Sequence, residues 1–302
     1  MTGRRWQVAA GEGTNVGEIV ARAGGDAKAI ADGRVFVGRR RVRGADEPVR
    51  VGDEVTIAPP RDQHDADVTI LARAQDLVAV AKPAGIPTIA DHHGASHSLL
   101  EVVARIADVD ASTLHATSRL DRDVSGVVVF ALTKGAAERL ARAREEGAYA
   151  RRYVAVASRA PSPDAGSWDV PIGVAKDPRH RAANGRDPAL AQTRYRVVAL
   201  AGEAALLALA PITGRTHQLR VHAAHAGAPI LGDKTYGGPA RIALASGRVL
   251  PIARILLHCA NVALPGLDIA APIPDDLAAI WLALGGDPAA WDTALSCSLE
   301  KR

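Results

Sequence analysis

The stretch "HATSRLDRDVSGVVVFALT", residues 115–133, places a cluster of charged side chains directly before an apolar run. The run from Val127 to Leu132 has the length and composition of a buried β-strand. The charged residues ahead of it are Arg119, Asp121, Arg122 and Asp123. Charges at the mouth of a buried strand form either a solvated turn or a functional site. The rest of the sequence has to distinguish these two interpretations.

Composition indicates a folded protein of about two domains, since the chain has 302 residues and is 48% hydrophobic. Aromatic residues make up only 3%, so small aliphatic side chains must fill the core. The net charge of +4 permits a polyanionic partner without proving one. A basic run at residues 34–43 contains five arginines and no acidic residue. That run is either a solvated strand pair or a nucleic-acid contact.

Several classes of protein are not expected. Cys259 and Cys297 are the only cysteines, so neither a disulfide framework nor a thiolate zinc site is indicated. His222 and His225 share a helical face, but ordinary packing is favoured over a metal site because no third ligand has helical spacing. No apolar run is long enough to span a bilayer, and the first residues lack a signal-peptide core. We expect a cytoplasmic protein that binds no membrane.

The pattern of elements predicts a small module over residues 13–59, a polar linker over 60–67 and a larger domain over 68–285. Strands and helices alternate in the larger domain without a regular βαβ order, which favours an α+β fold. Residues 177–189 are expected to form a basic loop rich in turns. The other elements expected there are strands at 127–132, 150–158, 192–200 and 204–212, two strands within 68–85, and helices at 96–107, 133–147 and 215–227.

Three groups of residues could carry chemistry. Asp121 lies among arginines that favour its carboxylate form, although structural ion pairs of this kind are common. Arg215, His217 and Arg220 lie near the start of a predicted helix, where anions bind well. Arg151 and Tyr153 share one face of a predicted strand, and this tyrosine could be core or could stack on a base.

Taken together, these motifs resemble the RluA-type family of RNA pseudouridine synthases. "SRLDRDVSGVVVFALT" is similar to the family's catalytic stretch, and "GRTHQLRVHAAHAGAPILGDKTYGG" is similar to its second signature. Further motifs follow in the family's order: "AVAKPAGIPT", "RRYVAVA", "GSWDVPIGVAKDPRHR", "RILLHCANVALPG" and "APIPDDL". The similarity runs from about residue 67 to 280. Residues 13–59 resemble the S4-type RNA-binding module that often precedes this catalytic domain.

The resemblance implies a mixed, mainly antiparallel central sheet with flanking helices, and isomerisation of uridine to pseudouridine in structured RNA, ribosomal RNA being favoured over transfer RNA. It implies that Asp121 is the catalytic carboxylate, that Tyr153 stacks on the uracil and helps to remove its C5 proton, and that Arg220 holds Asp121 ionised. Arg119 would enter the space left by the extruded nucleotide. Arg215 and His217 would contact substrate phosphates. The reaction is redox-neutral, so no cofactor or metal is expected, and we expect a monomer whose partner is RNA.

The sequence departs from the family's pattern beside the catalytic stretch. Ser118 stands where the family has histidine, and Val124 stands where it has threonine. Ala81 and Arg151 replace an asparagine and a lysine of other motifs. A catalytically weak or inactive RNA-binding protein of the same fold therefore remains an alternative. A hydrolase that uses Asp121 would need a histidine to activate water, and the serine at 118 removes the nearest candidate in the sequence.

Overall fold

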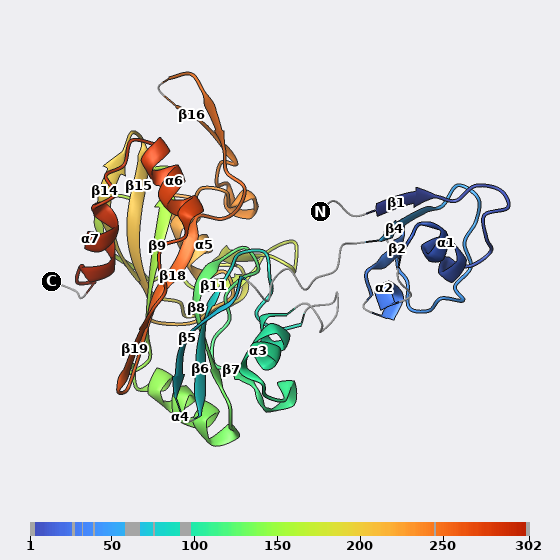
Figure 1. The fold of residues 1–302 in the computed structure, drawn as a ribbon. Coiled ribbons are helices and arrows are strands. Elements are labelled where there is room, and N and C mark those ends of the chain that lie inside the picture. The colour runs from blue at the N-terminus through green and yellow to red at the C-terminus, as the bar shows by residue number, and fades with distance from the viewer. Residues whose placement is uncertain are drawn as a thin grey trace. The chain divides into compact units, whose positions relative to one another are not determined.

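The computed structural model describes residues 4–25, 28–31, 33–38, 40–57, 67–74, 76–90, 98–244 and 246–299. The chain divides into two compact units, Met1–Asp67 with Ala90–Ser98 and Val68–Ile89 with Leu99–Arg302 (Figure 1). They are called here the N-terminal unit and the larger unit. Of the linker predicted at residues 60–67, all but Asp67 lies outside the described residues.

The N-terminal unit is a small antiparallel sheet with two helices. Its four strands follow the order β1-β4-β2-β3. The side chain of Asn15 accepts a hydrogen bond from the Glu18 amide and so caps the first helix. The sheet includes a strand that precedes the predicted start at residue 13. The elements are β1 (Arg4–Gln7), α1 (Val16–Arg22), α2 (Lys28–Ala31), β2 (Val35–Val37), β3 (Arg40–Arg41) and β4 (Glu54–Ile57).

The basic run at residues 34–43 is only partly a solvated surface. Arg34 is buried, although arginine is usually exposed. The side chain of Arg40 forms an ion pair with Glu47. Arg39 lies outside the described residues. The charge of this run is therefore partly compensated within the unit itself.

The larger unit is built on a ten-stranded sheet in which neighbouring strands follow the order β10-β14-β15-β9-β18-β8-β6-β5 (Figure 1). Strand β19 also pairs with β18, and β7 with β8. Strands β8 and β18 run parallel, and the other paired strands are antiparallel. The ten strands are β5 (Thr69–Ala74), β6 (Leu77–Lys82), β7 (His115–Ala116), β8 (Ser125–Ala131), β9 (Ala150–Ala157), β10 (Ala165–Trp168), β14 (Thr193–Ala201), β15 (Ala204–Pro211), β18 (Leu257–Leu264) and β19 (Leu267–Ala270).

The predicted α+β fold with a mixed, mainly antiparallel sheet is confirmed. Every residue of β8 is buried, as the opening apolar run predicts. The helices are α3 (Leu99–Ala107), α4 (Lys134–Glu145), α5 (Gln218–His225), α6 (Asp275–Ala283) and α7 (Ala290–Ser296), with 3₁₀ turns at Ala111–Thr113 and Lys234–Tyr236. Thr133 caps α4 through the Ala136 amide, and Gly147 follows its end at φ 75°. No helix in the described ranges is long and apolar enough to cross a membrane.

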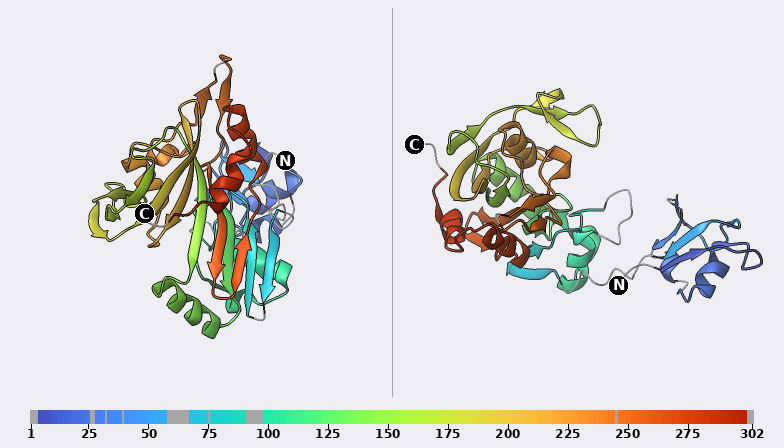
Figure 2. Two further views of the ribbon diagram at one scale, coloured as in Figure 1. Left: turned by 90° about the vertical axis from the view of Figure 1, so that its left-hand side faces the viewer. Right: turned by 90° about the horizontal axis from the view of Figure 1, so that it is seen from above.

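The expectation of a loop at residues 177–189 is wrong. The segment contains β12 (Arg181–Ala183) and β13 (Arg186–Ala189), which both pair with β11 (Ile172–Val174). Its polar sequence hides the strands because their backbones pair without an apolar face. Gly173 allows this close pairing, since a Cβ there would lie 2.4 Å from the Arg186 carbonyl oxygen. A separate hairpin of β16 (Arg241–Ala243) and β17 (Val249–Pro251) projects from the unit (Figure 2).

Helix α5 begins later than the pattern at 215–227 predicts. Its first residue is Gln218, whose side-chain oxygen accepts hydrogen bonds from the Arg215 amide and the Thr213 hydroxyl. His217 adopts a left-handed conformation with φ 57° and so cannot belong to the helix. The predicted stop at Gly227 is confirmed, with φ 74°.

Gly126 permits a close approach of two backbones beside the predicted site. It lies at φ 123°, and a Cβ there would be 2.2 Å from the carbonyl oxygen of Cys259 on β18. The parallel pairing of β8 with β18 places these two residues opposite each other. Any side chain at this position would force the central strands apart.

Replacing this glycine is therefore expected to destabilise the larger unit. We predict that Gly126→Ala lowers the free energy of unfolding by about 2 kcal/mol or more, measured by thermal denaturation. Gly135→Ala is the control, because that glycine lies in α4 with no atom within 4 Å of an added Cβ. The control should be neutral or slightly stabilising. Equal melting temperatures for both variants would contradict the steric argument.

Candidate active site

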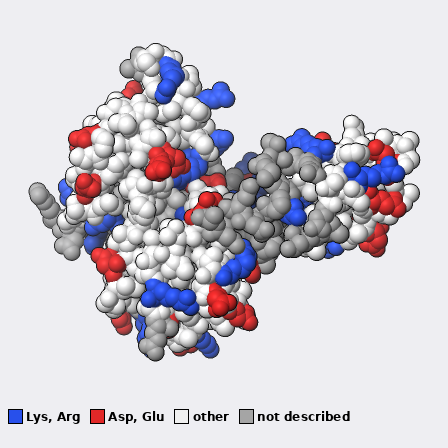
Figure 3. Space-filling model, viewed as in Figure 1, with Lys and Arg blue, Asp and Glu red and all other residues white. Residues whose placement is uncertain are grey.

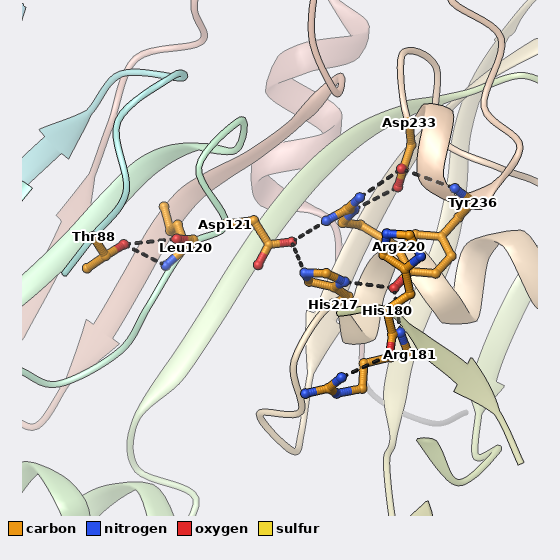
Figure 4. Close-up of polar contacts among 9 residues, drawn as sticks. All are labelled: Thr88, Leu120, Asp121, His180, Arg181, His217, Arg220, Asp233 and Tyr236. Carbon is orange, nitrogen blue, oxygen red and sulfur yellow. Dashed lines mark hydrogen bonds and ion pairs between the residues drawn. The ribbon is translucent and has the colours of Figure 1, made fainter. Parts of the chain in front are cut away.

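Asp121 lies in the loop that leads into β8, and its backbone is held on both sides. The Thr88 hydroxyl donates to the carbonyl of Leu120 at 2.9 Å and accepts from the Leu120 amide at 3.0 Å (Figure 4). After the aspartate, the amide of Val124 donates to the Asp121 carbonyl at 3.1 Å. The loop is thus a fixed turn that presents the Asp121 carboxylate just before the start of the buried strand β8.

A buried lysine supports the same loop from β6. The ammonium group of Lys82 donates to the carbonyl oxygens of Pro83, Arg122 and Val124 at 2.9, 2.9 and 2.7 Å. Three acceptors match the three donors of an ammonium group. Burial lowers the pKa of Lys82 to about 7, and the charge of Asp121 opposes this shift. Lys82 therefore ties the end of β6 to the backbone carbonyl groups of Arg122 and Val124, which follow Asp121 in the loop.

Arg220 on α5 joins Asp121 to a second carboxylate. Its Nη1 donates to Oδ2 of Asp121 at 2.8 Å, while Nε and Nη2 donate to the two oxygens of Asp233 at 2.7 and 2.8 Å (Figure 4). Asp233 is 1% exposed, whereas Asp121 is 28% exposed. Burial acts to lower the pKa of Arg220, but the two carboxylates raise it overall. The buried Asp233 thus orients the arginine, and Asp121 remains partly accessible to solvent.

The imidazole of His217 lies near the same carboxylate oxygen of Asp121. His217 Nε2 is 3.9 Å from Oδ2 of Asp121, which is longer than a hydrogen bond. Its Nδ1 is 2.7 Å from the hydroxyl of Tyr236, and this hydroxyl also accepts from the amide of Arg181 at 3.0 Å. The ring of Tyr236 stacks on the guanidinium of Arg220, 4.9 Å from Cζ to the ring centroid. The structure thus places a histidine beside Asp121 although the sequence has serine at 118.

Tyr153 lies on β9 and pairs across the sheet with Cys259 on β18, which in turn pairs with Gly126 on β8. It is 5% exposed, and burial raises the pKa of its hydroxyl well above the ordinary value. Arg151 lies near enough to act on this hydroxyl electrostatically, as expected for residues on one strand face. The tyrosine is therefore a protonated phenol within the sheet beside the start of β8.

Two of the predicted substrate-binding residues lie at the surface. Arg119 and Arg215 are exposed. The Nε atom of Arg215 donates to the Leu190 carbonyl at 2.9 Å. Asp121, Arg220 and His217 are thus the predicted site residues that the structure brings into contact range.

The structure also shows the positions of His222 and His225, for which ordinary packing was favoured over a metal site. His222 is buried, with Nδ1 2.9 Å from the Thr193 hydroxyl and Nε2 2.9 Å from the Val170 carbonyl. Burial lowers the pKa of this imidazole. His225 is exposed. Within the part of the chain that the structure describes, no three His, Cys, Asp or Glu side chains are grouped so that they could hold a metal.

The sequence reasoning assigned no role to four residues that shape this site: Lys82, Thr88, Asp233 and Tyr236. A lysine that ends an apolar strand was the available signal for the first, because buried lysines need acceptors. Asp233 and Tyr236 lie in the quoted signature stretch, but "GDKTYGG" reads as an ordinary turn. Ser118 is buried and accepts a hydrogen bond from the Tyr149 hydroxyl at 3.3 Å.

Removing the lysine tests how firmly the loop is held. We predict that Lys82→Met lowers the free energy of unfolding by about 2 kcal/mol or more, because it leaves buried carbonyl groups without donors. Thermal denaturation measures this loss. Lys134→Met is the control, because that lysine is 85% exposed on α4, and it should change stability by less than about 0.5 kcal/mol. A Lys82→Met protein as stable as the control would show that these hydrogen bonds contribute little.

Residues 76–225 match the family model described as RNA pseudouridylate synthase. Ribosomal large subunit pseudouridine synthase D of Vibrio parahaemolyticus is 32% identical over 283 residues, covering 85% of this chain and 85% of that protein. Dual-specificity RNA pseudouridine synthase RluA of Escherichia coli is 37% identical over 199 residues, covering 63% of this chain and 84% of that protein.

A solved structure shows the same fold. Human RNA Pseudouridylate Synthase Domain Containing 4 superposes with a TM-score of 0.59 and 26% sequence identity. The match covers 72% of this chain and 92% of that one. The large mixed sheet described above is therefore shared with a protein of that family.

Proposed function

The chain belongs to the RluA-type family of RNA pseudouridine synthases and isomerises uridine in RNA, and from this premise we propose that Asp121 is its catalytic carboxylate. The contact of Asp121 with Arg220 at 2.8 Å is the observation that supports this most strongly. It gives a partly exposed carboxylate a fixed direction at the end of a buried strand. An anion held in this way can act at the junction of sugar and base.

The reaction needs such an anion beside the glycosidic bond. The bond between N1 and C1′ of uridine is broken, the uracil is turned and a bond between C5 and C1′ is formed, while C5 loses its proton and N1 gains one. The carboxylate either attacks the sugar or acts through a glycal route, and both use the same position of Asp121. Because product and substrate are isomers, no oxidant or reductant is required.

Tyr153 and the arginines are proposed to hold the nucleotide. The raised pKa of Tyr153 keeps its phenol protonated, which favours stacking on the uracil over removal of a proton from C5. Arg220 aligns the carboxylate, and the exposed Arg119 enters the space left by the extruded base, since a stacked base hides its glycosidic bond. Arg215 lies at the entry to α5, where a substrate phosphate would be bound. His217 lies at the same entry, but its two ring nitrogens face Tyr236 and Asp121, so its proposed role is at the carboxylate.

For the substrate, we propose a structured RNA, with ribosomal RNA favoured over transfer RNA. The similarity to the Vibrio protein, whose name specifies the large ribosomal subunit, supports this choice and extends over 85% of both chains. We further propose that the S4-like N-terminal unit binds RNA and that the protein acts as a monomer in the cytoplasm. Figure 3 shows basic and acidic side chains interspersed on the face in view, so charge alone selects no RNA-binding surface there.

The first test concerns the carboxylate. We predict that Asp121→Asn abolishes pseudouridine formation while largely sparing RNA binding, because it removes the negative charge but keeps the shape. Pseudouridine mapping of total RNA, in cells that lack the gene and carry either wild type or variant, measures this and identifies the RNA. Asp123→Asn is the matched control, because this neighbouring carboxylate is exposed. Its modification pattern should equal that of wild type.

Two results would count against the proposal. Full turnover by Asp121→Asn would remove this residue from the mechanism. If no uridine depends on the wild-type protein although it is expressed, the alternative of an inactive RNA-binding protein is favoured, with Ser118 and Val124 as the substitutions to revert first.

The second test concerns the N-terminal unit. We predict that replacing Arg39, Arg40 and Arg41 together with glutamine weakens RNA binding and flattens its dependence on salt, because fewer counterions are released. The logarithm of the affinity against the logarithm of salt concentration gives the slope. Neutralising Lys134, Arg139 and Arg142 on α4 removes the same charge and serves as the control. If both triple variants shift the slope equally, net charge rather than this basic run governs binding.

A further inference from the structure

We propose that His217 is held as a neutral imidazole with its proton on Nε2, and that Tyr236 fixes this tautomer so that the Nε2–H group faces the Asp121 carboxylate as a positioning donor. The tautomer is a property of the folded protein alone. Its consequence for turnover rests on the proposed role of Asp121.

The hydrogen bonds around Tyr236 determine which nitrogen carries the proton. The backbone amide of Arg181 can only donate, so it occupies one lone pair of the tyrosine hydroxyl at 3.0 Å. The hydroxyl keeps its own proton, since burial raises the pKa of Tyr236. Of the two partners that the described residues give this hydroxyl, the Arg181 amide is a donor, and His217 Nδ1 at 2.7 Å is the one that can accept its proton. A neutral imidazole that accepts at Nδ1 carries its hydrogen on Nε2.

The surroundings favour the neutral form of the ring. Burial is the largest influence and lowers the pKa of His217, and the charges of Arg220 and Arg181 act in the same direction. The carboxylates of Asp121 and Asp233 oppose them without reversing the shift. The side chain is 19% exposed. The imidazole is therefore a donor at one nitrogen and an acceptor at the other.

The backbone holds the ring in this place at a conformational cost. His217 is at the N-cap position of α5 with φ 57°, and its side chain makes no capping hydrogen bond. A left-handed conformation costs a non-glycine residue about 1 kcal/mol or more. The side chain instead points to Tyr236 and Asp121, as Figure 4 shows. The residue is thus committed to the site rather than to the helix.

The donor completes one side of the carboxylate. Among the described residues, the contacts to Asp121 from Arg220 and His217 both reach Oδ2. At 3.9 Å the imidazole does not yet form a hydrogen bond, and such contacts in unliganded sites often tighten when substrate is bound. Two donors on Oδ2 leave Oδ1 for the nucleotide. Tyr236 then acts on Asp121 only through His217, as a second positioning residue.

Nuclear magnetic resonance can read the tautomer directly in the full-length protein without RNA. Long-range ¹H–¹⁵N correlation spectra separate protonated from unprotonated ring nitrogens, and His217→Gln assigns the signal. We predict a protonated Nε2 and an unprotonated Nδ1 near neutral pH. Tyr236→Phe should move the signal of the ring toward a mixture of tautomers. Tyr195→Phe is the control, because this buried hydroxyl donates to the Pro163 carbonyl and should leave the signal unchanged.

Turnover provides the second measurement. Tyr236→Phe keeps the ring that stacks on Arg220 but removes the partner of the Arg181 amide, so we expect a slightly lower melting temperature. We expect an unchanged KM and a kcat about tenfold lower, as for one lost hydrogen bond. His217→Gln, which can still donate from an amide at the ε position, should retain more activity than His217→Leu. Stability loss without this separation of kcat from KM would indicate a merely structural role.

The outcomes of the two measurements distinguish this inference from the proposed function. A proton on Nδ1 in wild type, or a Tyr236→Phe spectrum identical to wild type, overturns the inference even if the enzyme is fully active. If the tautomer is as predicted and Asp121→Asn retains turnover, the proposed role of Asp121 fails while the assignment of His217 stands. The predicted tautomer with the expected loss of kcat supports both.

Discussion

The site depends on one buried guanidinium that is shared by two carboxylates. A charged group removed from water is costly unless it is paired and hydrogen-bonded, and Arg220 meets both conditions. Asp233 occupies Nε and Nη2 in a two-point contact, which fixes the plane of the guanidinium and directs Nη1 at Asp121. The position of the more exposed aspartate therefore depends on a residue that substrate need never touch.

The same logic explains why the two halves of the site come from distant parts of the chain. Asp121 and Arg220 are 99 positions apart, and each is fixed by its own element. The loop is held by Lys82, the last residue of β6, and by Thr88, which follows that strand. Helix α5 is anchored by Gln218 at its start. A rigid loop and a rigid helix end can hold an ion pair in one geometry at little further entropic cost.

Sequence reasoning succeeded where the determinants are local. The ends of α4 followed from Thr133 and Gly147, and the buried strand β8 followed from its apolar run. It failed for β12 and β13, whose pairing with β11 is made by the backbone and has no side-chain pattern. The pairing of Asp121 with Arg220 came from the family resemblance, because no local spacing encodes a contact across the fold. The role of Asp233 was hidden for the same reason.

A carboxylate that acts on RNA must tolerate a polyanion, and the arrangement of charge around Asp121 meets this requirement. Its negative charge is balanced on the inner side by Arg220, which is itself balanced by Asp233, so the three together carry one net negative charge. Exposed arginines at 119 and 122 lie on the same loop and offset the repulsion of a phosphate backbone. A neutral His217 adds a donor without adding charge. A protonated imidazole would instead compete with Arg220 for the carboxylate. Because Arg220 and the proposed neutral imidazole of His217 both approach Oδ2 of Asp121, the other carboxylate oxygen stays available to the nucleotide.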